Sequence, residues 1–180
     1  MNDEAAVIAK VKQGEADAFR ELVDRHGDRL FCFIRNLVAD AHQAEDLAQE
    51  TFLAAYRNIG VFYTRQGKFS TWLLTIARNK CFTALKRRRT VSLSAESDPA
   101  DARTPEKELV QDEFFARLDS VLAELPFVQK TAFILAEIQD LSYEEISRVE
   151  QVKIGTVKSR VARAREKLRK EFRCVAGDNP

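Results

Sequence analysis

The sequence has few of the residues that build disulfide frameworks or metal centres. It contains 3 cysteines and 2 histidines among 180 residues. Cys32, Cys81 and Cys174 are far apart and form no CxxC pair or Cys/His cluster, and His26 and His42 have no nearby ligand partner. A disulfide scaffold and a zinc site are therefore excluded, and reduced cytosolic thiols are indicated. We expect no metal and no cofactor, structural histidines, and Cys32 and Cys81 buried as small apolar side chains.

Long apolar runs are also absent. No run approaches the ~18 residues of a membrane-spanning helix, and the acidic N-terminus lacks the apolar core of a secretion signal. We therefore expect a cytoplasmic protein without membrane insertion. Glycine and proline are scarce, at 6 and 4 residues, and fall mostly between periodic segments, which favours uninterrupted helices.

The periodicity of nearly every segment is helical, and it predicts an all-α protein made of two small helical domains. Helices are expected near residues 4–12, 15–38, 41–58, 70–88, 106–124, 127–139, 142–149 and 153–172. The stretch TVSLSAESDPADARTP has the composition of a flexible linker, with small polar residues, acids and two prolines. The predicted organisation is an N-terminal domain at residues 1–89, a linker at 90–105 and a C-terminal domain at 106–180.

Charge is distributed unevenly along the chain, although the net charge is only +1. Residues 65–89 hold 8 basic and no acidic residues, and residues 153–173 hold 9 basic and 2 acidic ones. Residues 1–64, in contrast, carry 11 acidic and 7 basic residues. Either basic block alone is as compatible with a solvated face as with a binding site, but two such blocks suit a polyanion bound at two places.

The C-terminal basic block has the pattern of a helix-turn-helix. Ser142 and Glu145 predict a capping box at the start of a first short helix. The second helix has a buried stripe at spacings of four, three and four, which consists of Val157, Val161, Ala164 and Leu168. Its cations lie off that stripe: Lys158, Arg160, Arg163, Arg165 and Arg169. This arrangement is typical of a reader of the DNA major groove.

The other basic block mixes aromatic rings with cations around a loop that precedes a helix, which Ser70 is expected to cap. The rings are Phe62, Tyr63, Phe69 and Trp72, and the loop cations are Arg65 and Lys68. Rings stack on unstacked bases while Lys and Arg neutralise phosphates, so this composition suits single-stranded nucleic acid. Core packing of Phe69 and Trp72 is the alternative.

A third feature is one helical face within residues 41–58. At i, i+3 and i+4 spacing it combines Asp46, Gln49, Glu50, Leu53 and Arg57. This mixture of charge and apolar surface is compatible with docking on a partner helix and equally with a solvated face.

Taken in order and spacing, these motifs resemble one known family. The segments AEDLAQETFLAAYRNI, FSTWLLTIARNKCFTALKRRR, LP at 125–126, LSYEEIS and IGTVKSRVARAREKLR are similar to the extracytoplasmic-function sigma factors of bacterial RNA polymerase, over roughly residues 15–172. The resemblance implies a region 2 domain and a region 4 domain joined by a flexible linker. It also implies three partners: core RNA polymerase, at its β′ clamp and β flap; promoter DNA; and a dedicated anti-sigma factor, as is common in the family.

The same resemblance assigns residues to three contacts. For docking on the β′ clamp it implies Asp46, Gln49, Glu50 and Phe52. For minus-10 recognition and melting it implies Phe62, Tyr63, Arg65, Lys68, Phe69, Trp72, Asn79, Lys80, Arg87 and Arg88. For the minus-35 element it implies Thr156, Lys158, Ser159, Arg160 and Arg163. The sequence departs from the family at residues 149–153, where Gln151 lacks a glycine's freedom at positive φ and predicts a looser or differently capped turn.

Two other classes of function remain as alternatives. An autonomous helix-turn-helix regulator would use only the C-terminal domain, with the N-terminal helices serving dimerisation or effector binding. That reading leaves Trp72 and the basic run that follows it without a role. An enzyme acting on nucleic acid is the second alternative, but no carboxylate cluster, metal-ligand set or nucleophile and base pair stands out, so we expect no catalytic activity.

Overall fold

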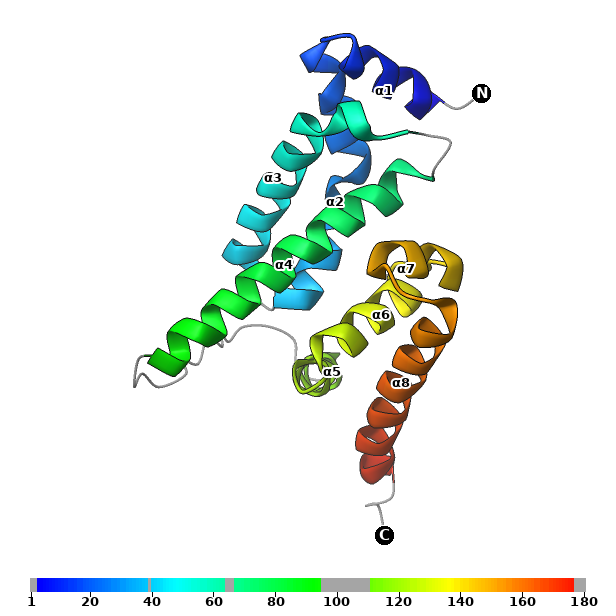
Figure 1. Ribbon diagram of the computed structural model, residues 1–180. Helices are drawn as coiled ribbons and strands as arrows, with labels where there is room; N and C mark the ends of the chain where they lie inside the picture. The colour runs from blue at the N-terminus through cyan, green and yellow to red at the C-terminus, as the bar shows by residue number, and fades with distance from the viewer. Residues whose placement is uncertain (1–2, 39, 64–66, 95–110, 177–180) are drawn as a thin grey trace. The chain divides into compact units, whose positions relative to one another are not determined.

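The computed structural model describes residues 3–38, 40–63, 67–94 and 111–176, and these residues form helices without any strand, as predicted (Figure 1). The chain divides into an N-terminal unit, residues 1–87, and a C-terminal unit, residues 88–180. The first unit contains α1 (Asp3–Lys12), η1 (Ala16–Ala18), α2 (Phe19–Val38), α3 (Ala41–Arg57), η2 (Ile59–Val61) and most of α4 (Phe69–Ser94). The second contains α5 (Gln111–Ala123), α6 (Phe127–Glu137), α7 (Tyr143–Glu150) and α8 (Ile154–Ala176).

The core of the N-terminal unit is built around α2, which packs against α1 and α3. The buried side chains of α2 include Phe19, Leu22, Leu30, Phe33, Ile34 and Leu37. Asp40 follows the end of α2 and caps the start of α3. Its carboxylate accepts a hydrogen bond of 2.8 Å from the Gln43 backbone N–H. The two helices are therefore fixed side by side, with the outer face of α3 left to solvent.

The helix α4 begins at Phe69, one residue earlier than expected, so the prediction that Ser70 caps it is wrong. The first turn is closed instead by the Trp72 backbone N–H, which donates to the carbonyl of Lys68. Burial of the Phe69 ring accounts for the earlier start, since the ring is only 1% exposed. At its other end α4 continues to Ser94, into the stretch predicted as linker, while residues 95–105 of that stretch lie outside the described residues.

The C-terminal unit is organised around α8, which packs against α5, α6 and α7. The predicted stripe of α8 is confirmed: Val157, Val161 and Ala164 are at most 1% exposed, and Leu168 is 9% exposed. Ala164 and Leu168 join Val121, Leu122 and Leu125 in one apolar cluster. This burial fixes which side of α8 faces solvent.

The two cysteines whose side chains are described have different environments. Cys81 is buried in α4, as predicted, and desolvation raises the pKa of its thiol to about 12. Cys32 is exposed, so the prediction that it is buried is wrong. It lies off the buried stripe of α2, where its sulfur is 3.5 Å from the Asn36 amide nitrogen. Cys174 falls outside the residues whose side chains are described.

A thiol reagent at neutral pH should label Cys32 and leave Cys81 unmodified in the folded protein. The thiolate is the reactive species, and a raised pKa moves its formation to higher pH, so at pH 7 almost none is present at Cys81. Mass spectrometry of digested, labelled protein measures both sites. A C32S variant supplies the control, and labelling of native Cys81 at the rate of Cys32 would contradict the burial argument.

The described residues offer neither a membrane-spanning helix nor a metal-binding cluster. No helix there has an apolar stretch long enough to cross a membrane. No cluster of three or more His, Cys, Asp or Glu side chains that could hold a metal ion occurs in the same part of the chain.

Candidate nucleic-acid interface

The helix-turn-helix of the C-terminal unit consists of α7, a short turn and α8. The capping box at its start is confirmed: the Ser142 hydroxyl accepts from the Glu145 backbone N–H at 3.2 Å, and the Glu145 carboxylate accepts from the Ser142 N–H at 3.0 Å. The turn is closed at Gln151, which takes a left-handed conformation with φ of 54° and donates its N–H to the Ser147 carbonyl. A non-glycine residue thus fills the position that favours glycine.

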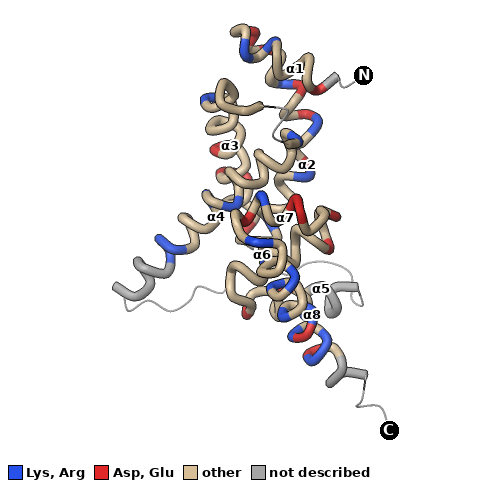
Figure 2. Tube along the Cα trace, turned by 45° about the vertical axis from the view of Figure 1, so that its right-hand side comes forward, with Lys and Arg blue, Asp and Glu red and all other residues tan. Residues whose placement is uncertain are grey.

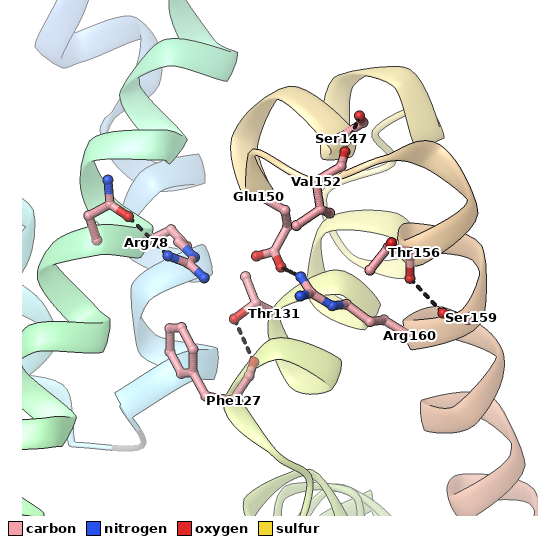
Figure 3. Close-up of polar contacts among 10 residues, drawn as sticks. Arg78, Phe127, Thr131, Ser147, Glu150, Val152, Thr156, Ser159 and Arg160 are labelled. Atoms are coloured by element: carbon pink, nitrogen blue, oxygen red, sulfur yellow. Dashed lines mark hydrogen bonds and ion pairs between the residues drawn. The ribbon is translucent and has the colours of Figure 1, made fainter.

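A side chain also braces this turn. The Ser147 hydroxyl donates a 2.5 Å hydrogen bond to the Val152 carbonyl, across the junction of α7 with the turn (Figure 3). At the start of α8 the Thr156 N–H donates to the Lys153 carbonyl at 2.9 Å. The entry into the second helix is therefore set by local hydrogen bonds, despite the absence of glycine.

The helix α8 carries Lys and Arg along much of its length (Figure 2), and several of these cations form ion pairs. Arg165 is paired with Glu137 of α6 at 2.5 Å, and this hydrogen-bonded carboxylate raises the pKa of the guanidinium. Lys167 is paired with Glu124 at 2.8 Å. Lys158 and Arg163 are exposed and form no ion pair with any residue the structure describes. These two are the predicted minus-35 cations that remain available to a polyanion.

Arg160, which the resemblance assigns to the minus-35 element, also has a partner inside the motif. Its guanidinium forms an ion pair with the carboxylate of Glu150, the last residue of α7 (Figure 3). The Glu150 side chain is fully buried, and that of Arg160 is 18% exposed. The pair therefore links the two helices of the motif from a largely desolvated position, so Arg160 has a structural part whatever else it contacts.

The remaining minus-35 candidates lie near the start of α8. Ser159 is exposed and its hydroxyl donates to the Thr156 carbonyl at 2.9 Å, while Thr156 is half-buried. Thr156, Ser159 and Arg163 follow each other at spacings of three and four, and therefore share one helical face. That face is separate from the buried stripe, and it carries two hydroxyl groups and one guanidinium group.

In the N-terminal unit, three of the predicted minus-10 rings form an aromatic cluster. Phe62 lies 5.6 Å from Phe69 and 5.1 Å from Trp72 between ring centroids, and Phe69 lies 5.7 Å from Trp72. Phe62 is 4% and Phe69 1% exposed, whereas Trp72 is half-buried. Phe62 and Phe69 therefore support the loop from within, and Trp72 is the member of the cluster with a surface toward solvent.

Tyr63 is the exposed ring of this region, with 58% of its surface accessible. The ammonium of Lys12, at the end of α1, lies over the ring at 4.8 Å from its centroid. Lys68 is exposed, and Arg65 lies outside the described residues. A ring that is both exposed and next to a cation has the chemistry for stacking on an unpaired base.

Polar candidates on α4 border an open groove between α3 and α4, about 470 Å³ in volume. Asn79, Lys80 and Arg87 line it, together with Leu47, Glu50, Ile76, Thr83 and Ala84. Lys80 is paired with Glu50 across the groove at 2.8 Å, and Asn79 accepts a hydrogen bond of 3.1 Å from Arg78. Arg88 is exposed further along α4. A residue expected to bind DNA is thus tied to one expected to dock on polymerase.

The docking face predicted on α3 is at the surface. Asp46, Gln49, Glu50 and Arg57 are exposed, and Leu53 has 54% of its surface accessible. Phe52 differs, because it is half-buried and its ring packs against that of Phe19 in an edge-to-face arrangement, with 6.3 Å between the ring centroids. The face therefore offers charge around an exposed leucine, with Phe52 partly committed to the fold.

Three residues that shape these surfaces were not predicted from the sequence: Glu150, Lys12 and Glu4. The Glu4 carboxylate lies 2.7 Å from His26 Nε2, within hydrogen-bond distance, so the histidine expected to be structural does have a partner on α1. Lys12 contacts a loop 48 to 50 residues away in the chain. Their partners are distant in sequence or on another helix, and no pattern of local spacing could have found them.

Comparisons with known proteins agree with this architecture. Residues 22–91 match the model for sigma-70 region 2, and residues 115–168 match the model for sigma-70 region 4. The chain is 35% identical to the ECF RNA polymerase sigma factor SigW of Bacillus subtilis over 178 residues, covering 92% of this chain and 95% of the relative. It is also 35% identical to the RNA polymerase sigma-H factor of Pseudomonas aeruginosa, covering 91% of each chain.

Solved structures give the same result. The sigma factor RpoE in complex with the anti-sigma factor NepR from Bartonella quintana has a TM-score of 0.69 and 28% identity, covering 89% of this chain and 98% of that one. The structure of CnrH in complex with the cytosolic domain of CnrY has a TM-score of 0.70 and 25% identity, covering 97% of each chain. An aromatic and basic helical unit followed by a helix-turn-helix, with both region models matched in order, establishes that the chain belongs to the extracytoplasmic-function sigma factors of the sigma-70 family.

Proposed function

We propose that this protein is a promoter-specificity subunit that binds core RNA polymerase in the cytoplasm and directs transcription initiation at promoters with minus-10 and minus-35 elements. The observation that carries the proposal is the presence, in one chain, of both a unit suited to opened DNA and a unit suited to duplex DNA. The chain supplies binding surfaces and no covalent chemistry, so it is not itself an enzyme.

Each surface has a role in this proposal. The exposed face of α3, with Asp46, Gln49 and Leu53, docks on the β′ clamp of the polymerase. Tyr63 and Trp72 contact the opened minus-10 strand, while the α4 cations neutralise its phosphates. In the C-terminal unit, Arg163 and Lys158 reach the major groove of the minus-35 element, with Ser159 and Thr156 on phosphate or base edges.

We also propose that a protein inhibitor regulates this chain by covering such surfaces. Two structurally similar proteins were solved as complexes, one with an anti-sigma factor and one with the cytosolic domain of CnrY. The exposed leucine on α3 and the groove between α3 and α4 offer an inhibitor both apolar and charged contacts.

Run-off transcription tests the main proposal. Purified bacterial core polymerase is supplied with this protein, or not, on a pool of promoters from the source genome. The expected result is specific initiation that depends on the protein, and the pool then identifies its promoter. No initiation, together with duplex binding by the protein alone, would favour the autonomous regulator instead.

If the Arg163 guanidinium contacts a base, Arg163→Ala should reduce the binding free energy that distinguishes the minus-35 element from other sequences by about 1–3 kcal/mol. The effect should appear as weaker footprinting over that element, with promoters of different minus-35 sequence discriminated less. Lys167→Ala is the matched control, because this cation is paired with Glu124, which directly follows α5. Unchanged minus-35 preference in the Arg163 variant would refute the contact.

A further inference from the structure

The end of α1 is joined to the segment that carries Tyr63. The Lys12 ammonium donates to the Phe62 carbonyl and, at 3.5 Å, to the Gly60 carbonyl. The same ammonium lies 4.8 Å from the centroid of the Tyr63 ring. One cation thus contacts the backbone before Tyr63 and the Tyr63 side chain itself.

Lys12 is itself held in place, because α1 is anchored to the body of the N-terminal unit. Val7, Ile8 and Val11 are buried at 3–5% exposure. Glu4 pairs with His26 of α2 at 2.7 Å, and the His26 ring lies 5.3 Å from Phe69. A side chain extending from such an anchored helix contacts the loop from a defined position.

The Lys12 contacts fall on the turn that leads to Tyr63. The helix η2 ends at Val61, Phe62 turns its ring into the aromatic cluster, and Tyr63 follows with its ring exposed. Two carbonyls of this turn, those of Gly60 and Phe62, receive their side-chain hydrogen bonds from the single Lys12 ammonium. A cation held over a ring restricts where that ring lies, and so lowers the entropy lost when a base stacks on it.

We propose that Lys12 is a positioning residue for promoter melting, which holds residues 60–63 so that Tyr63 presents its ring to an unstacked base. The inference rests on the proposed function, since Tyr63 is assigned there to the opened strand. Lys12 acts through Tyr63, and it makes its contribution after the polymerase has bound the duplex promoter.

The chemistry of the contact selects the variants. Methionine matches the length and apolar stem of lysine but removes the charge and the donors, so Lys12→Met should break all three contacts. Arginine keeps the charge, the donors and the affinity for an aromatic face, so Lys12→Arg should rescue function. Lys10→Met is the matched control, because it removes the same charge from an exposed position on the same helix.

The experiment uses the full chain with core polymerase, on a promoter that the wild-type protein has already initiated in the run-off assay. Failure of wild-type initiation would refute the proposed function rather than this inference. With Lys12→Met, we expect permanganate reactivity of the opened thymines to appear about three- to fivefold more slowly, while closed-complex affinity stays unchanged. Lys12→Arg and Lys10→Met should behave as wild type.

A double-mutant cycle with Tyr63→Ala decides the mechanism. If Lys12 acts through Tyr63, Lys12→Met adds no further defect in the Tyr63→Ala background. If Lys12 binds a phosphate directly, the two defects add and the salt dependence of binding loses about one unit of slope, which would overturn the proposal. Urea unfolding followed by fluorescence of the single tryptophan, Trp72, checks stability, and the midpoint of Lys12→Met must match that of the wild type. A lowered midpoint that Lys12→Arg does not restore would also overturn the proposal.

Discussion

Replacing Arg160 with methionine should destabilise the C-terminal unit by about 3 kcal/mol, because it leaves the fully buried Glu150 carboxylate without its guanidinium. Removal of one partner from a buried ion pair costs more than loss of a surface pair, since the remaining charge stays desolvated. We take the lower end of the expected range because Glu150 has a further interaction besides this one. Hydrogen exchange of α7 and α8 peptides in the full chain would measure the effect as faster exchange.

Two further variants separate charge burial from loss of packing. Glu150→Gln combined with Arg160→Met removes both charges, and should restore most of the stability that Arg160→Met alone loses. Arg163→Met, at an exposed position on the same helix, should leave hydrogen exchange unchanged. Equal exchange in Arg160→Met and Arg163→Met would show that the buried pair contributes nothing measurable.

Loss of the buried pair would also affect promoter selection, because α8 carries the residues proposed to contact the minus-35 element. A weaker minus-35 preference in an Arg160 variant would combine any lost base contact with a loosened helix-turn-helix. Arg163 has no ion pair with a described residue, and its removal therefore reports recognition more directly. The ratio of the two defects indicates how much of the Arg160 effect comes from the fold.

Replacing Phe69 with alanine should destabilise the N-terminal unit by about 3–5 kcal/mol, because the ring is 1% exposed and its loss leaves a cavity. The cavity would open between Phe62, Trp72 and His26, whose rings all lie within 6 Å of the Phe69 centroid. Urea unfolding followed by fluorescence of Trp72, the single tryptophan, measures the midpoint for this unit.

Matched variants test whether the cavity is the cause. Phe69→Leu retains most of the apolar volume and should cost less than ~1.5 kcal/mol. Tyr63→Ala removes an exposed ring. It should change the free energy of unfolding by no more than ~0.5 kcal/mol and yet slow strand opening. An unchanged midpoint in Phe69→Ala would contradict the placement of this ring in the core.

These variants distinguish two kinds of aromatic residue that the sequence presented as one group. Phe62 and Phe69 are expected to act on promoter opening only through the stability and shape of the loop. Tyr63 and the solvent-facing side of Trp72 are expected to act on the DNA itself. Trp72→Ala should therefore spare loading on duplex promoter and slow opening, with a moderate loss of stability from its contacts in the cluster.

Much of the fold was predictable because its determinants repeat at short, regular intervals. The capping box of Ser142 and Glu145 spans one turn, and the buried stripe of α8 follows the period of a helix. The same reasoning failed at Cys32, where general preference favoured burial but the position lies on the outer face of α2. It also failed at Ser70, because burial of Phe69 in the aromatic cluster draws the start of α4 one residue earlier.

The sequence by itself determined the helical class, the order of its motifs and the family, since these depend on residue type and on spacing within a few turns. Only the tertiary structure decided which side chains are available for binding. In the tertiary structure Arg160 pairs with Glu150, and Lys12 contacts a loop 50 residues away in the chain. Phe62 and Phe69 are buried, whereas Tyr63 is exposed. The physical reason is that burial and ion pairing depend on partners from other helices, which local periodicity does not specify.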